Sequence, residues 1–444
     1  MAVPTGAQHE VGVEEMFFST TDHRGIIEQA NTTFVRLSRH PWEELIGAPH
    51  NVIRHPMMPG GAFRLMWDNL TAGHPFAAYV HNLAGDGSRY DVFAVLTPLR
   101  DGGYLSVRTR PLRTDLMADV DAVYAQAEQA EADRRGAGAG RAEAAGAGAE
   151  KVRAVLAGRG SDVAELIRTL VPAEVAALEE RLGGLPRRPD ATGALGDMLD
   201  LVHQVFDRLT DWMRALDRLS ALGDEMATTV GELRVAIGES AATAKLIGRA
   251  DSSWAPLMMP LQLWAEMGTE VRTVVAHLID GLEEVRVSAG EARLRIAMAR
   301  LFTHMTARFV VELIDHVSGS DRAAPAIGSL CRALQEGFEA MDEQVRRHRA
   351  GREETLRRVA ETAGLLQIPL DLMAAWHTMA TDREVPAGIA ALMPRIEDQL
   401  AMSTVSLERL RKLAADDGAA GGDRQVTGLV RQVAQLGELA GAVA

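Results

Sequence analysis

The 444-residue sequence has a single cysteine, Cys331, and only three lysines, at positions 151, 245 and 412. One thiol cannot form an internal disulfide or a cysteine-based metal cluster, so the chain fits a reducing compartment. Aromatic residues make up only 5% of the chain, and all four tyrosines precede residue 125. The N-terminal quarter is therefore expected to be built differently from the rest.

Long apolar runs are also missing. No stretch of about 18 uninterrupted apolar residues occurs, so no membrane span is expected. The first residues, MAVPTGAQHEVGVEE, lack the basic segment and following apolar segment of a secretory signal. The formal net charge of −14 argues against nucleic acid or an anionic membrane as the main partner. We expect a soluble cytoplasmic protein.

The length predicts two or three domains. Residues 13–112 are expected to form a mixed α and β domain, and residues 113–160 a helix followed by an Ala/Gly-rich flexible linker. Residues 161–444 are expected to form a helical bundle, and a division into subunits at 161–317 and 330–444 is one interpretation. The resulting fold class is α+β followed by an all-α region.

Turn chemistry and alternation indicate an antiparallel sheet in residues 13–112. Two short strands are predicted on either side of the turn Asp22–Gly25, where glycine suits a positive φ. Three more strands follow in consecutive hairpins joined by the turns GDGS and RDGG. Short helical segments lie between the two groups. This order predicts a sheet with helices packed against one face.

The remaining residues carry helical patterns. The run GAGAGRAEAAGAGA is expected to be flexible, because glycine in a helix interior costs about 1 kcal/mol per residue. Further on, apolar residues alternate spacings of four and three, which is typical of bundles and coiled coils. Interruptions are expected at 252–264 and 318–329. The seams contain Leu195, Leu199, Val202, Phe206, Leu209, Met213 and Leu216, then Leu294, Met298, Leu301, Met305 and Phe309, then Leu356, Val359, Ala363 and Leu366, and finally Ile389, Leu392, Ile396 and Leu400.

A family resemblance rests on three strings in residues 15–112. TTDHRGIIEQANTTF matches T-T-D-x-x-G-x-I-x-x-A-N-x-x-F, and ELIGAPHNVIRHPMMP matches E-L-x-G-x-P-H-N-x-x-R-H-P-D-M-P at all but one specified position. The later AFRLMW and YLSVRTR fit the corresponding helix and closing strand. The region resembles the PAS domain of the bacterial aerotaxis receptor and its relatives. The resemblance implies a sensory domain that holds FAD non-covalently between its sheet and its helices.

The resemblance also implies which residues bind the flavin. An isoalloxazine ring needs a flat apolar slot with a few placed polar groups, and amide side chains can pair with its carbonyl and N–H groups. Arg54 is expected at the pyrophosphate or near the charge of a reduced ring, while Trp67 and Phe76 supply stacking surface. The expected cofactor-binding residues are Asn31, Arg54, His55, Trp67, Phe76 and Asn82.

Several positions depart from the family pattern, which leaves flavin binding open. Met57 replaces an acidic residue, Phe76 a tryptophan and Asp91 an aromatic residue. Leu83-Ala84 replaces a basic pair. A PAS domain without ligand, acting as a docking or dimerisation module, is the alternative.

Each expected site residue also has a structural interpretation. Asn31 can cap the helix that follows it, Arg54 can tie a loop backbone, and Trp67 can belong to the core. His50 and His55 lack a nearby third nitrogen or sulfur ligand, so no metal site is expected.

Other sensory cofactors are less well supported. Haem requires an axial ligand such as histidine, and His50, His55, His74 and His81 are candidates without distinguishing context. A light-sensing flavin domain requires a photoreactive cysteine, which this region lacks.

No catalytic or phosphate-binding signature is found, so an enzyme is not expected. Residues 195–317 have the layout of a chemoreceptor signalling hairpin without its diagnostic residues, and a degenerate relative is one interpretation. We expect a downstream signalling protein as partner, and the seams make a homodimer plausible. The predicted function is redox, oxygen or energy sensing, transmitted by protein contact.

Overall fold

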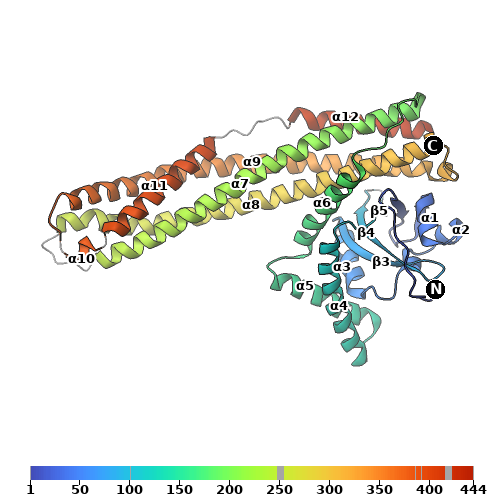
Figure 1. Cartoon of the computed structure of the whole chain (residues 1–444), viewed down its shortest axis with the longest axis horizontal. Helices are drawn as coiled ribbons and strands as arrows, with labels where there is room; N and C mark the ends of the chain where they lie inside the picture. The colour runs from blue at the N-terminus through green and yellow to red at the C-terminus, as the bar shows by residue number, and fades with distance from the viewer. Residues whose placement is uncertain are drawn as a thin grey trace. The chain divides into compact units, whose positions relative to one another are not determined.

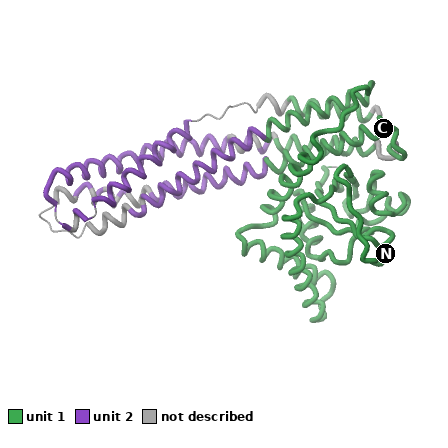
Figure 2. The backbone as a smooth tube through the Cα atoms, viewed as in Figure 1, with its two compact units in different colours: residues 1–213, 293–342, 422–444 green, residues 214–292, 343–421 purple. Residues whose placement is uncertain are grey.

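The computed structural model describes residues 2–100, 102–247, 255–385, 387–391, 393–415 and 423–443. The chain divides into two compact units, shown in Figure 2. The first contains residues 1–213, 293–342 and 422–444, and the second contains residues 214–292 and 343–421. None of the described helices is long and apolar enough to cross a membrane.

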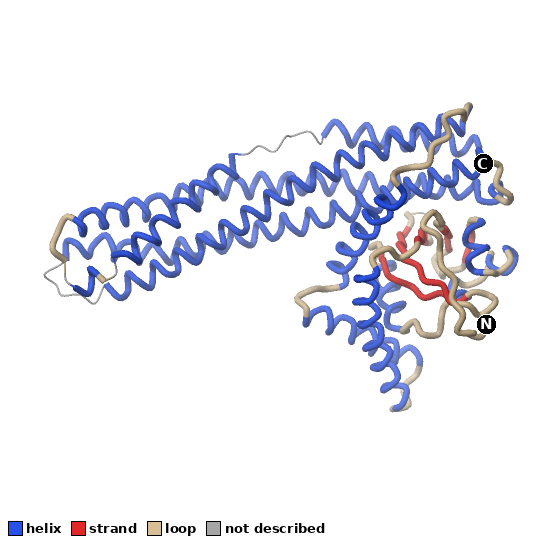
Figure 3. Tube along the Cα trace, viewed as in Figure 1, coloured by secondary structure: helices blue, strands red, loops and turns tan. Residues whose placement is uncertain are grey.

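Five strands in the first unit form one antiparallel sheet, drawn red in Figure 3. The strand order is β2-β1-β5-β4-β3, so the first hairpin lies beside the last strand of the chain. This arrangement confirms the predicted α+β plan. The strands are β1 (Phe17–Thr21), β2 (Ile27–Ala30), β3 (Phe76–Leu83), β4 (Arg89–Pro98) and β5 (Tyr104–Thr109).

The β1–β2 turn forms as its sequence predicts. The Asp22 carboxylate accepts hydrogen bonds from the backbone N–H of Arg24 (2.8 Å) and of Ile26 (2.9 Å). Gly25 adopts φ +78°, which side chains disfavour. The hairpin is therefore specified by its local sequence.

Four short helical segments connect β2 to β3. They are α1 (Thr32–Ser38), α2 (Trp42–Leu45), η1 (His50–Ile53) and α3 (Gly60–Thr71). Pro41, Pro49 and Pro59 precede three of them, each with extended backbone that ends the preceding segment. Proline lacks an N–H group and fixes φ, so the three residues separate the helices and set their boundaries.

The Ala/Gly-rich stretch is helical, and its prediction as a flexible linker was wrong. Residues 114–182 form α4 (Thr114–Gly136), α5 (Arg141–Gly158) and α6 (Val163–Leu182). A Cβ atom added to Gly61 of α3 would lie 2.4 Å from the backbone of Gly148 in α5. Small residues allow the two helices this approach, so tertiary packing overrides the low helix propensity of glycine. The domain boundaries drawn from the sequence at 112 and 160 stay predictions.

The rest of the chain is helical. The helices are α7 (Gly193–Ile247), α8 (Ala255–Ile314), α9 (Ser320–Thr381), α10 (Ala387–Ala390), α11 (Met393–Ala415) and α12 (Asp423–Val443). In the second unit, segments of α7, α8, α9 and α11 lie side by side around an apolar core (Figure 1). Its members repeat at spacings of three and four, as the seam at Val359, Ala363 and Leu366 predicts.

The predicted interruptions are shorter than expected. Residues 255–264 belong to α8, with Pro260 inside the helix, whereas residues 252–254 lie outside the described residues. The second interruption is a loop at 315–319, because α9 begins at Ser320. In the last predicted seam, Leu392 is outside the described residues and Ile396 is buried.

Candidate functional site

The inner face of the sheet carries polar side chains that are shielded from water. Strand alternation places Ser19, Asn82, Tyr90, Ser106 and Arg108 on this face, and each is at most 5% exposed. The segments α1 and η1 cover them. The Phe34 ring of α1 stacks on Phe17 of β1 at 4.7 Å, and His50 of η1 lies 3.1 Å from the Ser19 hydroxyl. We call this covered set of side chains the inner cleft.

Arg108 is the main charged group of the inner cleft. Its Nε donates to the Ser106 hydroxyl at 3.1 Å, and its Nη2 lies 3.1 Å from Nε2 of His50. The guanidinium lies 4.8 Å from the centre of the Phe17 ring, and its Nη1 has no hydrogen-bond partner. Burial lowers the pKa of Arg108 to about 10. Among the described residues no carboxylate pairs with it, so the cleft favours a ligand with acceptor or negative groups.

Two further polar atoms of the inner cleft have no protein partner. They are the Tyr90 hydroxyl and the Asn82 side-chain nitrogen, and both residues are at most 1% exposed. Tyr90 and Asn82 face each other across β3 and β4. Each buried, unpaired polar group costs about 1–3 kcal/mol. Three such atoms on one face, counting Arg108, indicate a site that a polar ligand or water completes.

His50 links the cleft to η1. Burial, together with the nearby Arg108 charge, holds the pKa of His50 well below its usual value. The ring is therefore neutral, and its Nε2 lies 3.1 Å from both the Arg108 guanidinium and the Ser19 hydroxyl. Among the described residues, no cluster of three His, Cys, Asp or Glu side chains is arranged to hold a metal ion.

Asn31, expected at the flavin, has a structural role in this fold. Its side-chain oxygen accepts from the backbone N–H groups of Phe34 and Phe18, both at 3.1 Å, and its nitrogen donates to the Met16 carbonyl at 2.9 Å. It thereby caps α1 and ties β1 to it, which is the alternative role considered from the sequence. Its contact with a flavin stays a prediction.

The structure brings Arg54, His55 and Asn82 together through their backbones. Arg54 forms an antiparallel bridge with Asn82, and the His55 N–H donates to the His81 carbonyl at 3.3 Å. The Arg54 guanidinium donates to the Met58 carbonyl at 2.8 Å and lies 4.2 Å from the Phe63 ring centre. Arg54 thus stabilises the loop that contains it, which is the structural role considered from the sequence.

The two predicted stacking residues lie apart. Trp67 of α3 meets Tyr104 of β5 edge to face at 5.3 Å, and a Cβ atom on Gly25 would lie 3.0 Å from its ring. Phe76, at the start of β3, lines a separate apolar cavity bounded by α3, α4, α5 and α6. Stacking of either ring on a flavin stays a prediction.

Sequence reasoning missed Tyr90 and Arg108. A signal was present in YLSVRTR, where alternation places residues 104, 106 and 108 on one face of a strand. A charged residue inside a strand that is otherwise uncharged and buried is itself unusual. What the sequence did not show is that this face is covered.

Comparison with known proteins agrees with this geometry. The chain is 40% identical over 121 residues to the aerotaxis receptor of Escherichia coli (strain K12). The sheet-and-helix region is a PAS domain of the aerotaxis-receptor type. The match covers 26% of this chain, and the chain covers 24% of the receptor.

Two other comparisons add little. The PAS domain of a protein from Colwellia psychrerythraea aligns with 21% of this chain and 85% of its own, at 19% identity and a TM-score of 0.19. No family model matches the chain.

The outer face of the PAS domain explains one departure from the family pattern. Asp91, which replaces an aromatic residue, lies 2.7 Å from Nδ1 of His81 and accepts from Nε of Arg89 at 2.7 Å. Nε2 of His81 lies 3.1 Å from the Asp121 carboxylate of α4. This cluster joins β3 and β4 to α4, so Asp91 has a role of its own in this chain.

The His81 cluster predicts a pH-dependent stability. Burial opposes a charge on His81, but the Asp121 and Asp91 carboxylates outweigh it and raise the pKa of His81 to about 9. Because this pKa lies above the unfolded value, the stabilisation is complete below about pH 6.5 and is lost as the pH rises through 9.

The expected result is a free energy of unfolding that falls between pH 7 and 10 in the native chain. In His81→Asn this fall should be smaller. Urea denaturation at several pH values measures both, and equal slopes for the two proteins would contradict the assignment.

Proposed function

We propose that this chain is a sensory signal-transduction protein whose PAS domain binds FAD in the inner cleft. The observation that carries the proposal is the set of three buried, unpaired polar atoms on Asn82, Tyr90 and Arg108. It lies within a domain of the aerotaxis-receptor type. Redox, oxygen or energy sensing through that cofactor is the function this combination supports best.

The residues of the cleft suit a flavin chemically. The ring presents carbonyl oxygens, which accept hydrogen bonds, and an N–H group, which donates one. The free donors of Arg108 and Asn82 match the carbonyl oxygens. FAD supplies a redox centre whose ring becomes more negative on reduction. Arg108, buried and without a carboxylate partner, would stabilise that negative charge. Asn31, Arg54, His55, Trp67 and Phe76 belong to the proposed surroundings of the cofactor.

Contacts within the first unit offer a route from the PAS domain to its helices. Phe18 of β1 meets Phe309 of α8 edge to face at 5.5 Å, and the Ser329 hydroxyl of α9 donates to the Gln29 side chain of β2 at 3.1 Å. The Tyr79 hydroxyl of β3 donates to Glu174 of α6 at 2.7 Å. A rearrangement of the sheet would therefore shift α6, α8 and α9. A partner protein or a second copy of the chain that binds these helices would respond to the shift.

The proposal predicts a yellow protein. Purified full-length chain should show the visible absorption of oxidised flavin, and Arg108→Met should bind FAD about tenfold more weakly, because a charge-assisted hydrogen bond is lost. Arg110→Met, on a residue outside the inner cleft, is the matched control and should leave FAD binding unchanged. Spectrophotometric titration of the apoprotein with FAD measures the three dissociation constants.

A colourless protein that takes up no added FAD would contradict the flavin assignment. The alternative is then a ligand-free PAS docking or dimerisation module. One observation favours it, since Phe34 stacks on both Phe17 (4.7 Å) and His50 (5.7 Å) and these rings fill part of the cleft. Gel filtration of the full chain would show whether it self-associates.

A further inference from the structure

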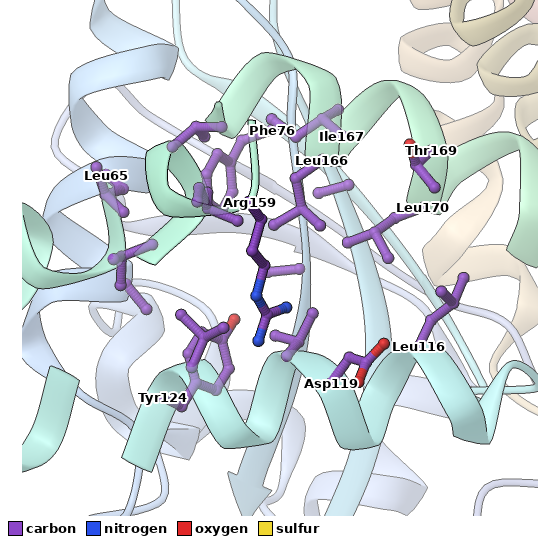
Figure 4. Close-up of a pocket in the computed structure, with 18 residues that line it drawn as sticks. Leu65, Phe76, Leu116, Asp119, Tyr124, Arg159, Leu166, Ile167, Thr169 and Leu170 are labelled. Carbon is purple, nitrogen blue, oxygen red and sulfur yellow. The ribbon is translucent and has the colours of Figure 1, made fainter. Parts of the chain in front are cut away.

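A second potential ligand site lies outside the inner cleft. A cavity of about 110 Å³ is bounded by β3 and by the helices α3, α4, α5 and α6 (Figure 4). For comparison, an engineered apolar cavity of about 150 Å³ binds benzene. The lining is mostly aliphatic, with Phe76, Asp119, Tyr124, Arg159 and Thr169 as its other residues. Its aliphatic members include Leu65, Val120, Val123, Val152, Leu156, Leu166 and Leu170.

The cavity follows from how α5 crosses its neighbours. Gly148 of α5 comes so close to Gly61 of α3 that no side chain fits between them. Val152 and Leu156 follow at intervals of four on the same face of α5, and both line the cavity. The helices are therefore in contact at the Gly148 end and separated beyond it. The space is a consequence of the helix arrangement.

The cavity also has one exposed cation in its lining. Arg159, the residue that ends α5, extends its guanidinium toward Tyr124 of α4 (Figure 4). In the described part of the chain no hydrogen-bond acceptor or carboxylate pairs with this guanidinium. The Tyr124 hydroxyl already donates to the Tyr79 carbonyl at 3.2 Å. Asp119 also lines the cavity, from α4, and is exposed.

We propose that this cavity binds a small monocarboxylate with a short apolar chain or ring. The apolar body would fill the aliphatic interior, because burying apolar surface is favourable and the lining offers almost no polar partner. The carboxylate would pair with the guanidinium of Arg159, whose planar donors match it. The volume restricts the body to about six carbons. The proposal does not depend on flavin binding.

Titration of the full-length chain with hexanoate, followed by ligand-observed NMR, tests the site. Saturable binding is expected, and Arg159→Gln should weaken it about fivefold. Hexanamide, which has the same shape without the charge, should bind more weakly by a similar factor. The matched control is Arg153→Gln, also on α5, whose guanidinium pairs with Asp68 at 2.9 Å and which should bind hexanoate normally.

A second variant tests the interior. Val123→Phe places a larger side chain in the cavity and should abolish hexanoate binding, while thermal unfolding shows that the protein is folded. Three results would overturn the proposal. They are hexanoate binding that does not saturate, hexanoate binding by folded Val123→Phe, and undiminished affinity both for hexanoate in Arg159→Gln and for hexanamide in the native chain. Tighter binding of norleucine that depends on Asp119 would also overturn it, because the ligand would then be a zwitterion.

Discussion

Glu179→Ala should lower the free energy of unfolding by about 3–5 kcal/mol, the effect of leaving a buried charge without its partner. Glu179 of α6 accepts two hydrogen bonds from Arg300 of α8, both at 2.7 Å. Arg300 also donates to the Thr210 hydroxyl of α7 at 2.6 Å, lies 4.4 Å from the centre of the Phe206 ring and is only 7% exposed. Without Glu179 the guanidinium stays buried among three helices with no counter-charge. Urea denaturation followed by circular dichroism measures the change.

Two controls separate this effect from a general sensitivity to substitution. Glu143→Ala removes an exposed ion pair with Arg134 and should change the free energy of unfolding by less than about 1 kcal/mol. The double variant Glu179→Leu with Arg300→Met removes both charges and should recover most of the loss. A double variant as unstable as Glu179→Ala would show that packing around the pair, and not the unpaired charge, accounts for the result.

The same carboxylate predicts how acid affects the first unit. Burial alone would raise the pKa of Glu179, but the neighbouring His304 and Arg300 outweigh it and lower the pKa. A carboxylate whose pKa is lowered in the folded protein stabilises the fold at pH values above its pKa in the unfolded chain. This contribution is lost as the pH falls through its pKa in the folded protein. The difference between the native chain and Glu179→Ala should therefore shrink in acid.

Gly61→Ala should destabilise the first unit by about 3 kcal/mol, because the added methyl group has no space. Its Cβ would lie 2.4 Å from the backbone N of Ala149 and 2.4 Å from the carbonyl carbon of Gly148. These are backbone atoms of α5, so the whole helix must shift. The shift would also disturb Glu131 of α4, whose carboxylate accepts from the N–H groups of Gly60 (3.0 Å) and Gly61 (2.7 Å) at the start of α3.

Gly146→Ala is the matched control, because nothing lies within 4 Å of a Cβ atom at that position of α5. It should leave the stability unchanged or raise it by up to about 1 kcal/mol, since alanine is the better helix former. The same denaturation experiment compares the two variants. A Gly61→Ala variant as stable as the native chain would contradict the close packing of α5 against α3.

Local chemistry in the sequence was enough to predict the elements of the PAS domain. The Asp22–Gly25 turn and the apolar alternation each act over a few residues, and each forms the predicted feature. The motif strings identified the domain type for the same reason, since a signature is a local property of the chain. Heptad spacing likewise predicted the long helices and the buried side of α9.

Predictions that depended on neighbours distant in sequence were less successful. Glycine propensity argued against a helix at 141–158, yet Gly148 is needed where α5 crosses α3. Neither Gly148 nor Gly61 shows from its own sequence neighbourhood that it contacts the other. Phe76 lines an apolar cavity bounded by α4, α5 and α6 that the sequence did not predict, and its contact with a flavin stays a prediction.

The sequence by itself determined the strands, the helices with clear apolar periodicity, the domain type and which side chains share a strand face, because these follow from local propensity and periodicity. Only the tertiary structure decided that helices cover both faces of the sheet, and therefore that Asn82, Tyr90 and Arg108 are buried with unpaired polar atoms. It also decided that Asn31 caps a helix and that Arg159 lies at an apolar cavity. Burial and hydrogen-bond pairing are properties of packed neighbours, and periodicity shows which face a residue occupies without showing what covers it.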